Sequence, residues 1–219
     1  METRNAAPAR GGSAAVAMTP WERSGGALFR ARSVTPVGLL AVALLWPTPG
    51  GLSWPLSCSA AALIVAGEAL RLWAVGVAGK LTRTRGANVR TLVTAGPFAV
   101  VRNPLYLGNF AVAYGVVVLS KVTWLLWAFP VLFGLQYAAI VAWEERVLSA
   151  AFGDAYDRYR RAVPRWLPAV RKAAGPGPWE SRIAWRSERD TTWGLLAVAA
   201  VLVVKHLWLH GAVAGLWAR

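Results

Sequence analysis

The sequence is poor in the residues from which disulfides and metal centres are built. It has one cysteine, Cys58, and two histidines, His206 and His210, among 219 residues. A single cysteine excludes an internal disulfide and a thiolate metal cluster. The two histidines have the i, i+4 spacing of a metal-binding pair, but no third ligand lies near them in the sequence. We therefore predict no metal site.

Acidic residues are also scarce. There are 10 Asp and Glu residues against 24 Lys and Arg, which gives a formal net charge of +14. A nucleic-acid-binding protein keeps its basic residues on a solvated face, whereas here they alternate with long uncharged runs. With 56% apolar residues and 13 tryptophans, the composition is typical of a membrane protein. We predict membrane lipids, and not nucleic acid, as its surroundings.

Apolar runs predict an all-α fold, a multi-pass integral membrane helical bundle with about five transmembrane helices. A helix needs roughly 20 apolar residues to cross a bilayer core of about 30 Å. The third and fourth runs are separated only by the neighbourhood of Lys121, which predicts a tight antiparallel helical hairpin. The five runs are 33–46, 56–79, 104–120, 122–143 and 193–217. The first of these is short and ends at prolines and glycines.

The basic residues predict the orientation of this bundle. Twenty of the 24 fall in residues 1–32, 80–102 and 146–189. Because short cytoplasmic loops collect Lys and Arg, this pattern predicts a cytoplasmic N-terminus. Residues 1–32 are rich in Ala, Gly, Ser and Arg without apolar periodicity, so we predict a disordered basic tail there. The preference for Arg and Ala is typical of GC-rich bacterial genomes and suggests a bacterial inner membrane.

Polar groups meet at the predicted cytoplasmic end of the hairpin. In "GPFAVVRNPLYLGNF", Arg102 comes just before Pro104, which is suited to the first turn of a helix. The free N–H groups of that turn, together with Arg102, predict an anion site. Glu144 and Glu145 end the fourth apolar run and return to the same depth, because both helices of the hairpin have similar length. A zwitterion with a carboxylate, an amine and ribose hydroxyls would suit such a site.

The residues after this glutamate pair predict an amphipathic helix. Leu148, Phe152, Tyr156 and Tyr159 recur at spacings of three and four, opposite a polar face rich in arginine. We expect this helix to lie in the membrane interface. A purely structural interpretation stays open, in which the glutamates neutralise nearby arginines, the aromatic residues pack on lipid, and Arg102 reaches phosphate headgroups.

Glu68 and Arg71 lie inside the second apolar run. An ionisable residue within the membrane calls for a functional hypothesis by default. Their i, i+3 spacing places them on one helix face, where each supplies a partner for the other, so we favour a structural ion pair.

Two separate blocks carry a resemblance to known proteins. The first is "GPFAVVRNPLYLG" at residues 96–108, and the second is "EERVLSAAFGDAYDRYRRAVP" at residues 144–164. The first block resembles a signature of the isoprenylcysteine carboxyl methyltransferase and phospholipid methyltransferase families, in which Gly-Pro and an aromatic residue are followed by Arg-His-Pro-x-Tyr-x-Gly. The second resembles the next block of these families, in which a glutamate pair is followed by Phe-Gly, two tyrosines and Val-Pro. The order and spacing of two blocks make the match specific.

The resemblance implies an integral membrane enzyme that binds S-adenosyl-L-methionine on the cytoplasmic side and methylates a lipophilic small molecule or a lipidated substrate. It implies a methyltransferase-like domain over residues 33–219, with its motif core at 96–168 and its last helix within 191–217. The cofactor site implied by the resemblance consists of Arg102, Asn103, Tyr106, Gly108, Glu144 and Glu145. The residues implied to lie nearer the substrate are Tyr156, Tyr159 and Arg165.

Two positions differ from the family pattern. Asn103 stands where the family usually has histidine, so a cofactor-positioning role is retained there and a proton-shuttling role is not. Ala162 stands where the carboxyl methyltransferases commonly have arginine, and Arg161 or Arg165 is placed to replace it.

The type of reaction depends on which residues are available to accept a proton from the substrate. A carboxylate acceptor needs none, whereas an amine must lose a proton to Glu144, Glu145 or a tyrosine. This favours O-methylation of a carboxylate. Two alternatives stay open: a membrane reductase that uses NADPH to reduce sterol-like or enone lipids, and a non-catalytic protein with the same scaffold. The reductase would need clustered basic residues for a nicotinamide phosphate and would have no use for the glutamate pair.

Overall fold

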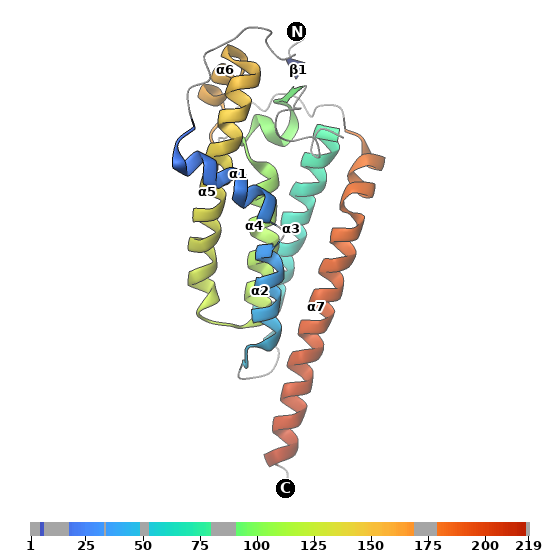
Figure 1. The fold of residues 1–219 in the computed structure, drawn as a ribbon. Helices are drawn as coiled ribbons and strands as arrows, with labels where there is room; N and C mark the ends of the chain where they lie inside the picture. Colours follow the sequence, from blue (N-terminus) through green and yellow to red (C-terminus); the bar gives the residue numbers. More distant parts are fainter. Residues whose placement is uncertain are drawn as a thin grey trace.

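The computed structural model describes residues 5–6, 18–32, 34–48, 53–79, 91–168 and 179–217. Within these ranges the chain is almost entirely helical, with long helices packed side by side (Figure 1). A 3-10 turn, η2 (Gly96–Ala99), and a two-residue antiparallel pairing of β1 (Asn5–Ala6) with β2 (Leu92–Val93) complete it. The helices are α1 (Pro20–Ala31), α2 (Val34–Leu45), α3 (Trp54–Ala78), α4 (Pro104–Ser120), α5 (Leu125–Phe152), α6 (Asp154–Ala162) and α7 (Ser181–Trp217).

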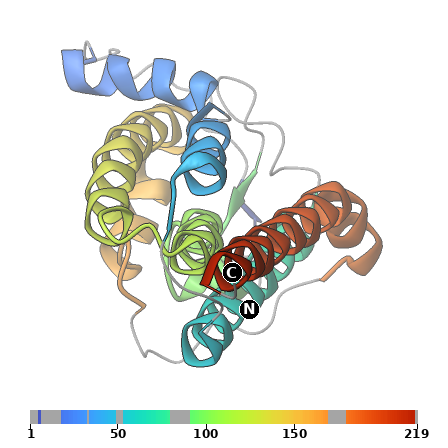
Figure 2. The same ribbon diagram turned by 90° about the horizontal axis from the view of Figure 1, so that it is seen from below.

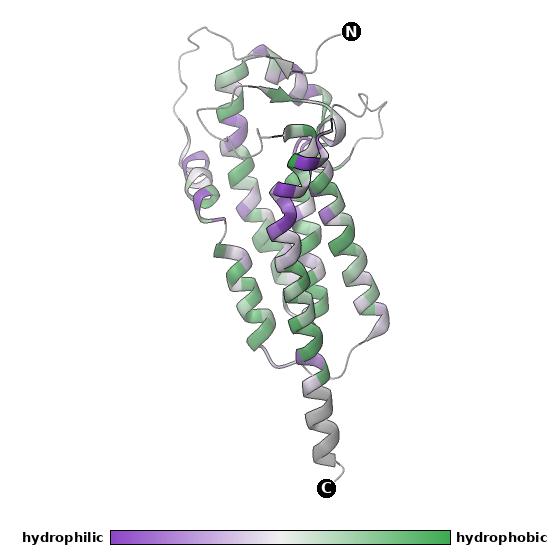
Figure 3. Ribbon diagram, turned by 90° about the vertical axis from the view of Figure 1, so that its right-hand side faces the viewer, coloured by the Kyte–Doolittle hydropathy of each residue, from purple (hydrophilic) through white to green (hydrophobic). Residues whose placement is uncertain are grey.

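The predicted all-α membrane bundle is confirmed. Helices α3, α5 and α7 are long and apolar enough to cross a membrane, and α1 with α2 forms a further candidate span bent by 61°. Helix α4 is a shorter apolar helix of 17 residues. Apolar residues run along most of the bundle, while hydrophilic ones gather toward the end where α6 lies (Figure 3).

Helices α4 and α5 form the predicted hairpin. Lys121 ends α4 in the left-handed conformation, with φ of 59°, and α5 begins four residues later. The start of α4 and the last turns of α5 therefore lie at the same end of the bundle, together with α6 (Figure 1). We call this end the motif end. Viewed along the bundle, α4 lies centrally, with α5 on one side and α3 and α7 on the other (Figure 2).

The prediction of a disordered tail over residues 1–32 is wrong for residues 20–31, which form α1. Thr19 and Glu22 make a reciprocal capping box, and Pro20 occupies the first helical turn. Helix α1 packs closely on α5, since a Cβ atom on Gly25 would lie 2.0 Å from the Ala139 carbonyl oxygen. The sequence "TPWE" at residues 19–22, with its N-cap threonine, proline and glutamate, is the pattern that predicts the start of this helix.

Two other helix boundaries differ from prediction. Helix α7 begins at Ser181, three turns before residue 193, and its start is held on α3: Glu180 N–H donates to the Gly76 carbonyl, 3.0 Å away. The predicted interfacial helix is divided at Gly153, whose φ of +51° favours glycine, so Phe152 ends α5 and Tyr156 belongs to α6.

Helices α3 and α4 approach closely through glycines. A Cβ on Gly67 would lie 2.7 Å from the Gly108 carbonyl oxygen and 2.8 Å from the Val112 amide nitrogen. A Cβ on Gly115 would similarly lie 2.8 Å from the Ala60 carbonyl. Because backbone atoms cannot rotate away, these small residues set the distance between the two helices.

We expect Gly67→Ala to destabilise the protein by about 1 to 3 kcal/mol, because overpacking forces α3 and α4 apart. The matched control is Gly134→Ala on α5, where an added Cβ meets no atom within 4 Å. That change should stabilise by up to about 1 kcal/mol through helix propensity. Unfolding by sodium dodecyl sulfate in detergent micelles, followed by tryptophan fluorescence, compares the two. Equal effects would show that the close approach is not a constraint.

Candidate active site

Arg102, Glu145 and Arg165 form an ion cluster at the motif end. Arg165 binds the Glu145 carboxylate through two nitrogens, at 2.9 Å and 2.5 Å. Arg102 Nη1 lies 2.9 Å from Glu145 Oε1. The hydrogen bonds to Glu145 raise the pKa of Arg165 above its usual value. Two guanidinium groups share one carboxylate, so the Arg102–Glu145–Arg165 cluster has a net charge of +1.

Arg102 retains hydrogen-bonding capacity in this cluster. Its side chain is 11% exposed. Despite the short distance to Glu145, the Nε and Nη1 N–H groups of Arg102 make no hydrogen bond of good geometry within the described part of the chain. Buried donors normally have an acceptor. These donors and the net charge suit an anionic oxygen of a bound molecule.

The segment after α6 is fastened to the start of α4. The Arg102 N–H donates to the Pro164 carbonyl at 2.9 Å, and the Asn103 side-chain amide donates to the Arg165 carbonyl at 3.0 Å. Asn103 occupies the N-cap position but makes no side-chain cap of α4. Asn103 therefore positions the backbone of Arg165, and its part in positioning the cofactor stays a prediction.

Glu144 is held separately from Glu145. It accepts a hydrogen bond of 2.7 Å from the hydroxyl of Tyr106, which is almost fully buried in the first turn of α4. The Tyr106 ring packs on that of Tyr137 with their centroids 4.6 Å apart. The two neighbouring glutamates thus have different partners: Glu145 holds two arginines, and Glu144 meets a tyrosine.

Tyr156 and Tyr159 of α6 lie beside this cluster. Phe152 and Tyr156 pack with Leu92 in a small apolar core, and Tyr159 donates to the Phe98 carbonyl at 2.8 Å. The aromatic face therefore packs on η2 and β2, which corrects the alternative interpretation in which these residues pack on lipid. The interfacial position of α6 stays a prediction. Packing of α6 brings the second sequence block onto the first.

Burial raises the pKa of Tyr156 to about 12, with a further contribution from the charge of Glu145. Burial also raises the pKa of Tyr159. Both hydroxyls hold their protons at neutral pH, so neither tyrosine is a suitable general base.

We expect the stability contributed by neutral Tyr156 to be lost as the pH rises from 10 to 12. Below pH 10 the residue is protonated in both states, because the pKa of an unfolded tyrosine is about 10. Between these values only the unfolded state releases the proton, so unfolding becomes easier by about 1.4 kcal/mol per pH unit. Unfolding free energies measured from pH 8 to 11.5 should fall less steeply for Tyr156→Phe than for the wild type. Parallel curves would contradict the raised pKa.

Some predicted residues have other surroundings. Gly108 faces α3, where an added Cβ would lie 2.6 Å from Arg71 Cγ, so the structure gives it a packing role and its part in cofactor binding stays a prediction. His206 Nε2 lies 2.9 Å from the Leu119 carbonyl oxygen. The side chain of His210 lies outside the described residues. Among the described residues, no three His, Cys, Asp or Glu side chains are grouped to hold a metal ion.

The sequence comparisons agree with this geometry. Residues 56–155, which include both glutamates, Arg102 and Tyr106, match the profile of the phospholipid methyltransferase family. This part, somewhat under half of the chain, is similar to that family. The predicted family resemblance is therefore confirmed. Three relatives, two named as metal-resistance proteins and one as a methyltransferase, match between 50% and 78% of the chain.

The relatives match the chain over different shares of their length. The chain is 29% identical to the cobalt-zinc-cadmium resistance protein CzcN of Cupriavidus metallidurans, over 50% of this chain and 51% of that protein. It is 26% identical to the nickel-cobalt-cadmium resistance protein NccN of Alcaligenes xylosoxydans, over 78% and 83%. It is 30% identical to human protein-S-isoprenylcysteine O-methyltransferase, over 58% and 46%. The chain thus spans about half the length of most of these relatives, and no solved structure matches it.

Proposed function

We propose that this protein is a membrane methyltransferase that uses S-adenosyl-L-methionine to methylate a carboxylate oxygen of a lipophilic substrate. The observation that carries the proposal is the Arg102–Glu145–Arg165 cluster, which has a net positive charge and unsatisfied buried donors on Arg102. It lies at the start of α4, where the first turn carries no side-chain cap. Positive charge at the start of a helix suits the carboxylate of the cofactor.

The other predicted residues have roles consistent with this placement. We assign Arg102, Asn103 and Glu145 to holding the cofactor carboxylate, with Glu145 orienting the two arginines. Glu144 and Tyr106 would contact the rest of the cofactor. Tyr156, Tyr159 and Arg165 would lie toward the acceptor, and Arg165 is the arginine that stands in for the residue replaced by Ala162.

Methyl transfer from an activated donor requires mainly that the protein align the donor and the acceptor. When bound, S-adenosyl-L-methionine would supply an activated methyl group to the acceptor oxygen, and the electron pair of its carbon–sulfur bond would stay on the sulfur. The protein's residues hold both molecules in line and exclude water. A carboxylate acceptor releases no proton in this step.

The small number of candidate bases among the described groups near the cluster favours the carboxylate over an amine. Tyr156 and Tyr159 hold their protons because burial raises the pKa of each. Both oxygens of Glu145 already lie against guanidinium groups. Glu144 is the remaining carboxylate, and it accepts the Tyr106 hydroxyl.

The test is to incubate membranes containing the protein with methyl-labelled S-adenosyl-L-methionine, extract the lipids and treat them with base. Methyl esters should release the label as volatile methanol. Label that stays in the lipid under base would instead indicate N-methylation. Calorimetric titration of purified protein with the cofactor and with NADPH provides the second readout: binding of NADPH alone would support a reductase, and binding of neither would support a non-catalytic scaffold.

A further inference from the structure

A separate cavity lies within the helical part of the bundle. It has a volume of about 630 Å³ and is bounded by the α1–α2 bend and by α2, α3, α4, α5 and α7. None of the residues of the Arg102–Glu145–Arg165 cluster lines it. This volume falls in the range of about 300 to 1,000 Å³ that is usual for small-molecule sites. The lining includes Arg32, Thr35, Leu39, Leu40, Arg71, Asn109, Val116, Phe129, Phe133, Tyr137, Thr191 and Val198.

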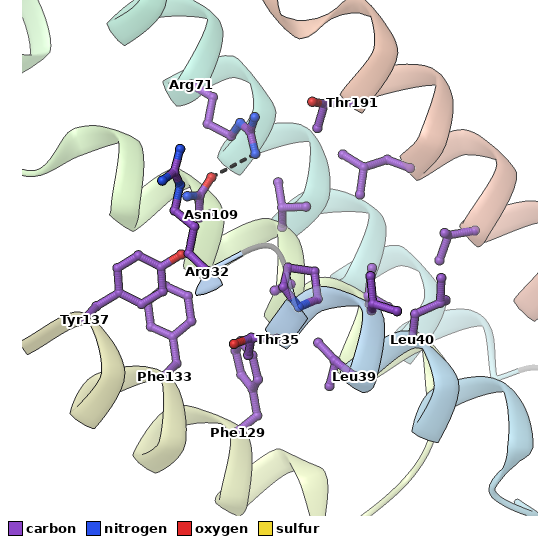
Figure 4. A pocket seen from close by; sticks show the side chains of 17 residues that line it. Arg32, Thr35, Leu39, Leu40, Arg71, Asn109, Phe129, Phe133, Tyr137 and Thr191 are labelled. Atoms are coloured by element: carbon purple, nitrogen blue, oxygen red, sulfur yellow. Dashed lines mark hydrogen bonds between the residues drawn. The ribbon is translucent and has the colours of Figure 1, made fainter. Parts of the chain in front are cut away.

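The cavity has a polar end and an apolar end. Arg32, Arg71 and Asn109 lie together at one end, and Leu39 and Leu40 lie toward the other (Figure 4). Arg71 is near the end of α3 and Asn109 is in the second turn of α4, so the polar end is the one toward the motif end. A molecule with a polar head and one apolar chain matches this division.

The polar end offers hydrogen-bond donors and no carboxylate. Arg71 Nη1 donates to Asn109 Oδ1 at 2.8 Å, which fixes the amide so that its NH₂ group remains to donate. Arg32 donates through Nη1 to the Phe29 carbonyl and lies 3.9 Å from the centre of that ring, which holds the guanidinium at the cavity mouth. The glutamates that pair with Arg71 are not part of the lining. Because Glu68 and Glu188 neutralise Arg71, the donors that remain for a ligand are Arg32 and the Asn109 amide, and these favour an anionic head.

One tyrosine connects the cavity to the candidate active site. Tyr137 lines the cavity, and its ring packs on Tyr106, whose hydroxyl donates to Glu144. Asn109 is also close to Tyr106, three residues later on the same helix. Tyr137 and Tyr106 therefore connect the lining of the cavity to Glu144.

From this arrangement we propose that the cavity binds a single-chain amphiphile with a carboxylate head, its chain lying over Phe129 and its head bound by Arg32 and Asn109. The role of this amphiphile as the methyl acceptor rests on the proposed function. The binding itself does not, because it needs only the cavity and its lining.

The test uses a sixteen-carbon fatty acid with a diazirine in its chain, and the corresponding alcohol and amine, with the purified protein in phospholipid nanodiscs. Illumination should label α4 and α5 segments that line the cavity, and the acid should label them most. Arg32→Gln should reduce labelling by the acid about tenfold, the effect of losing one charged hydrogen bond. The matched control is Arg30→Gln, on the exposed face of the same helix end, which should label as the wild type does.

A second pair of variants tests the position of the chain. Ala113→Trp fills the cavity and should abolish labelling there, whereas Gly134→Trp points into open space on α5 and should leave it unchanged. Equal labelling by the acid, alcohol and amine, or labelling outside the cavity, would overturn the proposal. Titration with S-adenosyl-L-methionine separates the two hypotheses: cofactor binding without cavity labelling refutes the cavity site alone, and labelling without cofactor binding refutes the proposed methyltransferase alone.

Discussion

Glu145→Gln should destabilise the protein by about 3 to 5 kcal/mol, the usual cost of removing one partner from a buried ion pair. Glu145 is 8% exposed, and both Arg102 and Arg165 lie on its carboxylate. Without that charge, Arg102 is left buried beside the other guanidinium with no compensating anion. The free energy of unfolding, measured by detergent denaturation, checks this effect.

The same substitution should weaken binding of S-adenosyl-L-methionine by about 1 to 3 kcal/mol, because the donors of Arg102 are no longer held in place. Calorimetric titration under conditions where the variant is folded gives this number. Asp154→Asn is the matched control: it makes the same chemical change on an exposed residue at the start of α6, and both quantities should stay within about 0.5 kcal/mol of the wild type.

These two readouts distinguish a binding site from a purely structural cluster. A cluster that only neutralises its arginines would lose stability in Glu145→Gln while cofactor affinity in the folded variant stayed the same. Such a result would remove Glu145 from the site. Unchanged stability would contradict the ion pairing itself.

The sequence alone was sufficient to predict how the two motif blocks meet. A hairpin of two helices with similar length returns Glu145 to the depth of Arg102, and the structure places the two side chains 2.9 Å apart. This worked because the bilayer fixes the length and direction of apolar helices, so residues at their ends have few possible positions.

The partners of the glutamates could not be predicted in the same way. The sequence offered Arg161 or Arg165 only as a replacement for the arginine missing at Ala162. The pairing of Arg165 with Glu145 depends on the turn after α6, which is held by bonds from Arg102 and Asn103 to the backbone of residues 164 and 165. Similarly, the break at Gly153 was hidden by an aromatic periodicity that continues across it, although successive residues on either side belong to different helices.

The ion pairs of Arg71 show a further limit of prediction from the sequence. The predicted contact of Glu68 with Arg71 is confirmed at 3.5 Å, but the sequence did not suggest Glu188, because residue 188 lies in the basic segment 146–189 and the last helix was predicted only within 191–217. In the structure residues 181–190 belong to α7, and Arg71 forms an ion pair with Glu188 while Thr192 donates to Glu68 at 2.7 Å. A residue far along the chain becomes a partner only when its helix is placed.

Arg71→Met should therefore destabilise the protein by about 3 to 5 kcal/mol, because it leaves two carboxylates, Glu68 and Glu188, without their shared cation in a low-dielectric environment. The effect should appear as easier unfolding by sodium dodecyl sulfate, with loss of the contact between α3 and α7. Arg186→Met, on the exposed face of the same turns of α7, is the control for loss of one positive charge and should have an effect below about 0.5 kcal/mol.

Replacing all three members of the Glu68–Arg71–Glu188 cluster separates the net contribution of the cluster to stability from the cost of removing one member alone. In the triple variant Glu68→Gln, Arg71→Met and Glu188→Gln, no buried charge of the cluster remains, and the amides can still accept the Thr192 hydroxyl. We expect this variant to recover most of the stability lost in Arg71→Met, since replacing every member of a buried ion cluster is often nearly neutral. A triple variant as unstable as Arg71→Met would show instead that the charged groups themselves hold α7 against α3.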